Sequence, residues 1–186
     1  MQTLLIADKD YQTENYIRLE ELITTFLEGQ GLKSEIMKIS KDDLAFCMGC
    51  FGCWVKTPGE CIIDDMMSKI NRNYINSDVV IYLSPIIFGQ FSANIKNSLD
   101  RWIPNILPFF IIRPDGSTMH PPRYNTYPKQ IIIGYGQRLS AEDMQLFSDI
   151  TKKHRNHLDV LFYQGDDNSI NEALNKIELG RVGGHL

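Results

Sequence analysis

The sequence predicts an α/β fold in which helices cover both faces of an open parallel sheet. Five short apolar segments have the character of buried strands, and they alternate with stretches whose apolar residues recur at helical spacing. Parallel strands require crossover connections, and these are almost always right-handed, so the alternation leaves few other arrangements. The shortness of the apolar segments favours strands that are buried on both faces.

The predicted strands are the segments TLLIA (3–7), SEIMKI (34–39), VVIYLS (79–84), QIIIGYG (130–136) and VLFY (160–163). Five strands within about 165 residues fit the flavodoxin-like order 2-1-3-4-5 better than the longer dinucleotide-binding domain.

Helical spacing fills the gaps between these strands. The predicted helical faces span residues 16–26, 66–74, 91–106, 144–150 and 170–177. Start signals precede three of them: Asp64-Asp65, then Ser92, then Ser140 with Asp143 as a capping pair. Gly29 and Gly31 form a plausible end for the first helix.

A chain of 186 residues with 43% hydrophobic and 23% charged residues has the composition of one globular domain. We therefore expect a single domain over residues 1–186, with an insertion at about 104–129. That segment holds six of the eight prolines, too many for a helix. Pro114-Asp115-Gly116 predicts a small hairpin turn within it.

The charge of the chain argues against some classes of partner. A net charge of −4 and a pI near 5.5 do not favour nucleic-acid binding. The N-terminal segment MQTLLIADKD has a short apolar run without a basic leader, so neither a signal peptide nor a membrane span is expected. A cytoplasmic location follows, in which thiols stay reduced.

Ligands of such sheets bind at the carboxyl ends of the strands, where residues 7–15, 84–93 and 134–138 form three loops. In the second loop, Gly89 permits a close backbone approach, and Phe88 and Phe91 offer flat apolar surface. A planar ring such as a flavin would fit there. The alternative is a plain turn with two phenylalanines in the core.

Several motifs resemble those of the NAD(P)H-dependent FMN reductases of the flavodoxin superfamily. They are CMGCFGCW with GEC, SDVVIYLSPIIFG, SANIKNSLDR and GYG, and the resemblance covers about residues 1–165. It implies FMN as cofactor, NAD(P)H as electron donor and a small-molecule acceptor such as a quinone or free flavin. It also implies ring contacts from Ser84, Pro85, Ile86, Ile87, Phe88, Gly89 and Gln90 on one side, and from Gly134, Tyr135 and Gly136 on the other.

The first loop departs from the pattern of that family. Its members usually carry a Gly/Ser/Thr-rich turn with an arginine, which holds the FMN phosphate at a helix N-terminus. This chain instead places Asp8, Asp10 and Glu14 there. Thr13 and Asn15 are the side chains that could still donate to a phosphate.

Four cysteines, Cys47, Cys50, Cys53 and Cys61, follow the spacing C-x2-C-x2-C-x7-C. Compact runs of this kind hold iron–sulfur clusters, and the related iron–sulfur flavoproteins use a similar motif. Free thiols beside a flavin are an equal alternative. Zinc and disulfides are weaker ones, because structural zinc sites usually pair two separate C-x2-C knuckles and the compartment is reducing.

We therefore predict an oxidoreductase in which NAD(P)H reduces FMN. The alternatives are an electron carrier of the iron–sulfur flavoprotein kind and a flavodoxin-like module that has lost FMN. An exposed face carrying Trp102, Phe109 and Phe110 would be a large apolar patch. We therefore expect a homodimer or homotetramer that buries residues within 100–125.

Overall fold

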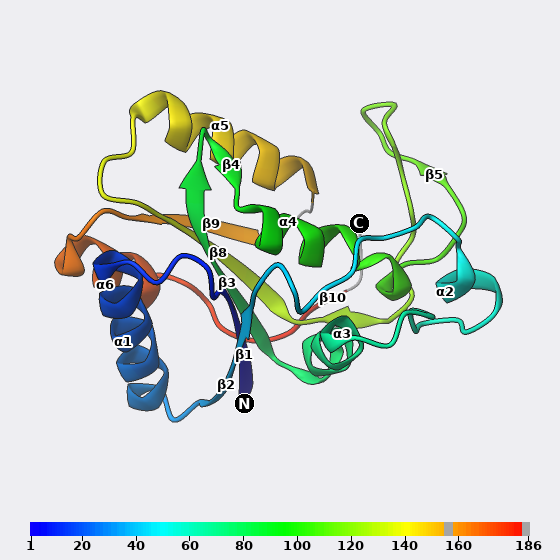
Figure 1. Cartoon of the computed structure of the whole chain (residues 1–186), viewed down its shortest axis with the longest axis horizontal. Coiled ribbons are helices and arrows are strands. Elements are labelled where there is room, and N and C mark those ends of the chain that lie inside the picture. The colour runs from blue at the N-terminus through cyan, green and yellow to red at the C-terminus, as the bar shows by residue number, and fades with distance from the viewer. Residues whose placement is uncertain (155–157, 184–186) are drawn as a thin grey trace.

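A parallel sheet with the strand order β2-β1-β3-β8-β9 forms the centre of the molecule (Figure 1). The computed structural model describes residues 1–154 and 158–183. The central strands are β1 (Gln2–Asp8), β2 (Lys33–Ile39), β3 (Val79–Ile87), β8 (Lys129–Tyr135) and β9 (Leu158–Tyr163). All four neighbouring pairs are parallel. The predicted fold, its five strands and their order are confirmed.

A sixth strand, which the sequence did not predict, extends this sheet. The short β4 (Gln90–Phe91) pairs antiparallel with the end of β3, so that Ile86 faces Phe91 and Ile87 faces Gln90. The chain therefore turns back on itself as a hairpin before α4 begins.

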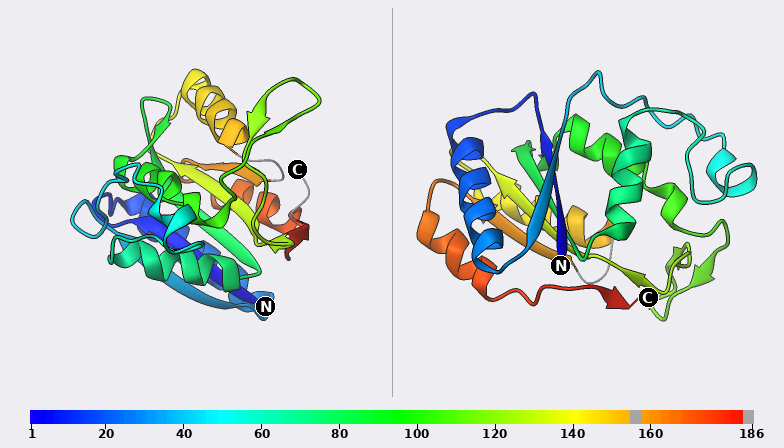
Figure 2. Two further views of the ribbon diagram at one scale, coloured as in Figure 1. Left: turned by 90° about the vertical axis from the view of Figure 1, so that its right-hand side faces the viewer. Right: turned by 90° about the horizontal axis from the view of Figure 1, so that it is seen from below.

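Five helices cover the two faces of the sheet (Figure 2). They are α1 (Glu14–Gly29) and α6 (Asp167–Asn175) on one face, and α3 (Met66–Asn76), α4 (Ala93–Asp100) and α5 (Ala141–His154) on the other. A four-residue helix, α2 (Gly52–Val55), lies in the cysteine segment. Among the residues that the structure describes, no helix combines the length and the apolarity that crossing a bilayer requires.

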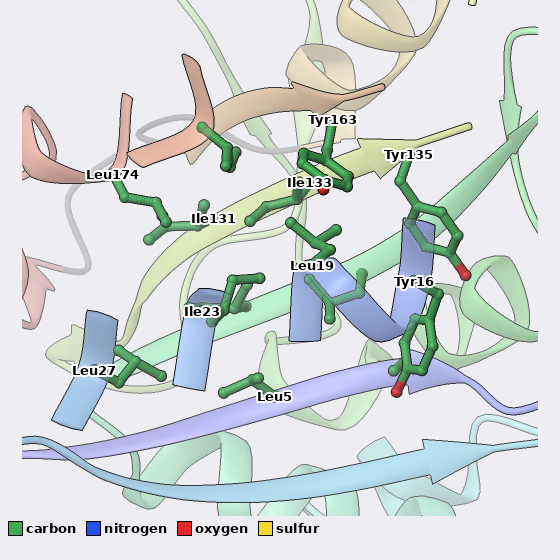
Figure 3. Close-up of a cluster of buried hydrophobic side chains, with 14 of the residues drawn as sticks. Leu5, Tyr16, Leu19, Ile23, Leu27, Ile131, Ile133, Tyr135, Tyr163 and Leu174 are labelled. Atoms are coloured by element: carbon green, nitrogen blue, oxygen red, sulfur yellow. The ribbon is translucent and has the colours of Figure 1, made fainter. Parts of the chain in front are cut away.

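The central strands bury side chains on both faces, which creates two cores. In β1, Leu5 belongs to the core under α1 and α6, whereas Leu4 and Ile6 belong to the core under α3, α4 and α5. Figure 3 shows the first core, where Leu19 and Ile23 of α1 meet the strands and Leu174 of α6. Alternation along each strand therefore divides the apolar residues between two helix layers.

Side-chain caps start the helices where the sequence predicted. The Asp65 side chain accepts from Met67 N, and Ser92 accepts from Ile95 N. Ser140 accepts from Asp143 N and donates to the Asp143 carboxylate. At the end of α1, Gly31 has a φ of +68°, which a residue without a side chain adopts without strain.

The third predicted helix, over residues 91–106, is wrong at its C-terminal end. Helix α4 stops at Asp100, and a short 3₁₀ helix, η1 (Ile103–Asn105), follows. Pro104 has no N–H, so a continued α-helix would leave the Asp100 carbonyl without its hydrogen bond. The chain therefore turns away at this point.

Residues 104–129 contain the predicted hairpin. Strands β5 (Ile111–Ile112) and β6 (Thr118–Met119) pair antiparallel around a turn in which Arg113 N donates to Ser117 O at 2.8 Å. Strand β7 (Thr126–Tyr127) then pairs with β10 (Val182–Gly183) near the end of the described chain.

A buried arginine ties the cysteine segment to the helical layer. Arg101, which caps the end of α4, is 2% exposed and forms an ion pair with Asp65, the N-cap of α3. It also donates to Ala45 O at 3.1 Å and to Cys61 Sγ at 3.3 Å. Both ends of the segment 45–65 are therefore fastened to the same guanidinium group.

Replacing Arg101 with Met should lower the free energy of unfolding by about 3 kcal/mol, because Asp65 would lose its buried partner. Chemical denaturation measures this loss. The control is Lys96→Met on the same helix, where Lys96 pairs with Asp100 and the two side chains are 38% and 50% exposed. Such exposed pairs contribute about 0.5 kcal/mol. An equal loss in both variants would contradict the role of the buried pair.

Candidate functional site

Two of the three predicted loops at the carboxyl edge of the sheet are tied together by hydrogen bonds. The Asn15 side chain donates to Gly136 O at 2.8 Å, and the Tyr135 hydroxyl donates to Tyr11 O at 3.1 Å. The loop after β1 and the loop after β8 therefore meet across the edge. The side-chain amide of Asn15 and the backbone of Gly136, both predicted site residues, are in direct contact.

The second predicted loop is a hairpin tip. Strand β3 continues through Ile87, and the turn consists of Phe88 and Gly89, whose φ angles are 50° and 70°. Positive φ at both central residues is the signature of a type I′ turn. Phe88 is unusual in this conformation, because side chains other than Gly, Asn and Asp are strained there. Its ring is nevertheless 91% exposed.

The predicted ring contacts differ in how accessible they are. Ser84 and Pro85 are buried, and Ser84 Oγ accepts from Ser92 N at 3.2 Å and donates to Pro85 O at 3.0 Å. Ile86 and Ile87 are half-buried, whereas Phe88 and Gln90 are exposed. The tip of the hairpin, and not its base, therefore offers side-chain surface to a ligand.

Phe91 does not line this surface, although the sequence suggested that it would. It is 6% exposed and packs on Phe147 of α5, with the ring centroids 4.7 Å apart. The antiparallel pairing of β4 with β3 turns Phe91 into the core while Phe88 stays at the tip.

The glycines of the predicted site make room for side chains of the chain itself. A Cβ on Gly89 would lie 2.7 Å from Leu146, and one on Gly134 would lie 2.6 Å from Ile86. Gly136 is similarly close to Leu139. These approaches pack the hairpin against α5 and β8, so the expected close backbone approach of Gly89 is to α5.

The first loop is acidic and internally bonded. Asp8 is fully buried, and its Oδ1 accepts from Asp10 N and from Asn94 Nδ2, both at 2.9 Å. Asp10 Oδ2 accepts from Asn94 Nδ2 at 2.9 Å and from Lys41 N at 3.1 Å. Asp8 Oδ2 has no hydrogen-bond partner among the described residues.

Asn94 was not identified from the sequence. Its single amide nitrogen bridges the carboxylates of Asp8 and Asp10 from the first turn of α4. The available signal was its place just after the Ser92 cap, on a helix that begins at the same sheet edge as Asp8. Which face of that helix meets the first loop is decided only by the packing of α4 on the sheet.

Tyr135 lies behind this loop. Burial and the nearby Asp8 carboxylate raise the pKa of Tyr135 well above its ordinary value. Its hydroxyl therefore stays protonated and remains a donor to Tyr11 O.

The four cysteines gather near one another at the other end of the molecule. All four are free thiols, with Cys47 and Cys50 exposed and Cys53 and Cys61 half-buried. Burial raises the pKa of Cys53, and the neighbouring thiols Cys61, Cys47 and Cys50 add to this effect. The donor set suits an iron–sulfur cluster, although no three ligand side chains in the described ranges already form a metal-binding group.

Four aromatic rings in successive contact, here called the aromatic ladder, join the cysteine segment to the β5–β6 hairpin: Phe51, Trp54, His120 and Phe110. The hairpin and the cysteine segment lie at the same end of the molecule (Figure 1). Phe51 stacks on Trp54 at 5.3 Å, Trp54 contacts His120 at 4.9 Å, and His120 contacts Phe110 at 4.4 Å. Trp54 also donates to Ile106 O at 3.0 Å. The ladder leaves Phe51 55% and Phe110 69% exposed.

A cavity of about 720 Å³ opens between the cysteine segment and α3. Its lining is mostly polar and includes Cys61, Asn71, Arg72, Asn105 and Tyr124. The Asn71 and Asn105 amides bond each other at 2.9 Å, so they stiffen the wall of the cavity.

Comparison with known proteins supports the resemblance seen in the motifs. No family model matches the chain. The chain is 36% identical over 78 residues to an iron–sulfur flavoprotein of Archaeoglobus fulgidus, and 33% identical over 75 residues to one of Methanocaldococcus jannaschii. These matches cover 42% and 40% of this chain and 34% and 38% of the relatives, so the chain matches little more than a third of their length.

Among solved structures, the NAD(P)H:quinone oxidoreductase from Methanothermobacter marburgensis aligns with a TM-score of 0.64. The two chains are 11% identical, and the alignment covers 95% of this chain and 92% of the other. At this identity the likeness concerns the fold. The chain therefore has a flavodoxin-like fold, and its relatives in sequence are iron–sulfur flavoproteins.

Proposed function

We propose that this protein is a flavin-dependent oxidoreductase. In this proposal NAD(P)H reduces a bound flavin, expected from the motifs to be FMN, and the electrons pass to a small acceptor such as a quinone or free flavin. The names of its sequence relatives and of its structural neighbour support a flavoprotein of this general kind.

The observation that carries the proposal is the hairpin tip at the carboxyl edge of the sheet. Phe88 combines a positive φ with 91% exposure, so it costs conformational energy and recovers no burial within the chain. Strained residues of this kind concentrate at functional sites. Leu146, 45% exposed, packs beside Gly89 and extends the apolar surface. A planar ring fits such a surface.

The chain itself has a positioning role in this scheme. When bound, a flavin supplies the electron-transfer chemistry, and the protein supplies orientation and hydrogen bonds. The β3–β4 hairpin would place Phe88 and its backbone groups along the ring. Tyr135 and Asn15 keep the facing loops closed through their bonds to Tyr11 O and Gly136 O. No side chain is required as a proton donor.

Replacing Phe88 with Gly should raise the free energy of unfolding by about 1 kcal/mol, because Gly relieves the strain of positive φ. The same change should weaken flavin binding by about 1 kcal/mol, since an aromatic contact is lost. Denaturation and fluorescence-quenching titration measure the two effects. Phe88→Tyr keeps the ring and should keep the affinity. Unchanged flavin affinity in Phe88→Gly would show that the tip does not contact the ring.

A second candidate is an electron carrier that holds an iron–sulfur cluster in addition to the flavin. The observation favouring it is the compact spacing of the four cysteines, of which Cys47, Cys50 and Cys61 are near enough to Cys53 to help raise its pKa. Cys47, Cys50, Cys53 and Cys61 would hold the cluster. Arg101, which already donates to Cys61 Sγ, would place a buried positive charge beside it.

Anaerobic incubation with ferric iron, sulfide and a thiol reductant should give a protein with bound iron and the broad visible absorption of a cluster. Cys53→Ser should lose both, because one of the four thiolate ligands is missing. Met48→Leu, an exposed neighbour between two of the cysteines, is the matched control and should keep both. A parent protein that takes up no iron and keeps four free thiols would contradict the cluster proposal.

We also propose that the protein associates with itself through the hairpin end. Phe109 and Phe110 are 64% and 69% exposed, and Ile112 is 78% exposed on the same hairpin. Trp102, which the sequence placed on this face, is instead half-buried against Tyr74 and Tyr127. The expected contact therefore depends on residues of the β5–β6 hairpin.

Phe110→Asp should convert the oligomer to a monomer of 21.4 kDa, because a charge would be buried in an apolar contact. Light scattering of the parent and the variant measures the mass. Ile17→Asp, at a 52% exposed position of α1, is the control and should leave the mass unchanged. A parent protein that is already monomeric would contradict the proposal.

A further inference from the structure

We propose that the flavin site recognises the ring and the polyol chain but does not hold a phosphate, so that riboflavin binds at least as tightly as FMN. This inference rests on the proposed function and names the form of flavin that the site accepts. It follows from the side chains around the start of α1, where a phosphate would otherwise bind.

The two predicted phosphate donors already have roles within the chain. Thr13 Oγ1 accepts from Tyr16 N at 3.2 Å as the N-cap of α1. The Asn15 amide donates to Gly136 O at 2.8 Å, which holds the first and third loops together. The Thr13 O–H and the second N–H of Asn15 remain as donors, but the cap and the bond between the loops fix where these two side chains point.

The carboxylates near the helix start are held in place and cannot easily move away. Asn94 and Lys41 N fix Asp10, and Asn94 also fixes Asp8. Glu14 adds a third carboxylate in the first turn of α1. Lys9 in the same loop offsets one of these charges, and a helix N-terminus is equivalent to about half a positive charge, so the three carboxylates still leave a negative balance.

The turn before α6 adds further negative charge on the other side. A Cβ on Gly165 would lie 3.7 Å from Asn15 Oδ1, so this turn lies against the start of α1. Asp166 follows Gly165 directly and carries this charge, whereas the charge of Asp167, the next residue, is offset by Arg18. Arg18, the nearest arginine on α1, is engaged by Asp167 at 2.8 Å and by Glu21 at 3.2 Å.

The same environment suits an uncharged polyol. Hydroxyl groups donate to carboxylates, and Asp10 and Glu14 are exposed acceptors at this edge. A phosphate dianion brings acceptors and negative charge to a surface that already has both. The favoured ligand is therefore a flavin whose side chain ends in a hydroxyl.

The test is the ratio of dissociation constants for riboflavin and FMN, measured with the apo-protein by fluorescence quenching. We expect riboflavin to bind as tightly as FMN or more tightly, and FMN to bind more weakly as the salt concentration falls. FMN binding tenfold tighter than riboflavin would overturn this inference and leave the proposed function standing. Failure of both flavins to bind would contradict the proposed function and this inference together.

Two charge-removing variants test whether repulsion by Asp10 weakens FMN binding. Asp10→Asn keeps the shape of the loop and should tighten FMN binding about three- to tenfold while leaving riboflavin unchanged, because one repulsive charge is removed. Glu28→Gln makes the same change of charge at the exposed end of α1, about 21 Å away along the helix, and should leave the ratio unchanged.

If the ratio of the riboflavin and FMN dissociation constants is the same in Asp10→Asn as in the parent, the electrostatic explanation is contradicted. Tightening of FMN, but not of riboflavin, by Mg²⁺ well beyond the tightening by Na⁺ at the same ionic strength would show that a cation bridge holds the phosphate. That result would also overturn the inference.

Discussion

Burial of the central strands on both faces is the constraint on which the rest of the structure depends. In β1, β3 and β8, successive side chains enter opposite cores, and nearly all of them are inaccessible to solvent. Two helix layers are needed to cover such strands. Because the strands are parallel, each crossover connects the carboxyl end of one strand to the amino end of the next. The carboxyl ends of the strands therefore collect at one edge, and the loops after β1, β3 and β8 face each other there.

Polar contacts then decide what that edge can do. Asn94, Asn15 and Tyr135 connect segments that are far apart in the sequence. Each donates a side-chain hydrogen bond to an acceptor in another loop: the Asp8 carboxylate, Gly136 O and Tyr11 O respectively. Their effect is to hold an acidic loop in one shape. Hydrogen bonds of this kind specify geometry more than they add stability, since each replaces a bond to water. The hairpin tip is different, because it is strained and exposed and has apolar surface to offer.

The cysteine segment is held to the protein by a few anchoring contacts, whereas the sheet is held by packing on both faces. It has few buried apolar residues of its own, and it is held at its ends by Arg101 and in its middle by Trp54. The exposed thiols and aromatic rings between these anchors make little contact with the cores. The segment is therefore fastened to the fold without being packed into it, which leaves its side chains available for a ligand or a second subunit.

The sequence by itself determined the layers, the strand order and most helix starts, because these follow from local apolar periodicity and from caps such as Ser92 and Ser140. It also identified the acidic loop and the cysteine spacing. The tertiary structure alone decided that Phe91 points into the core and that Trp102 is half-buried. It alone brought Asn94 to Asp8 and Arg101 to Cys61. The reason is physical. The burial of these side chains and their contacts depend on residues that are distant in the chain, and local sequence patterns do not specify which distant side chains will be in contact.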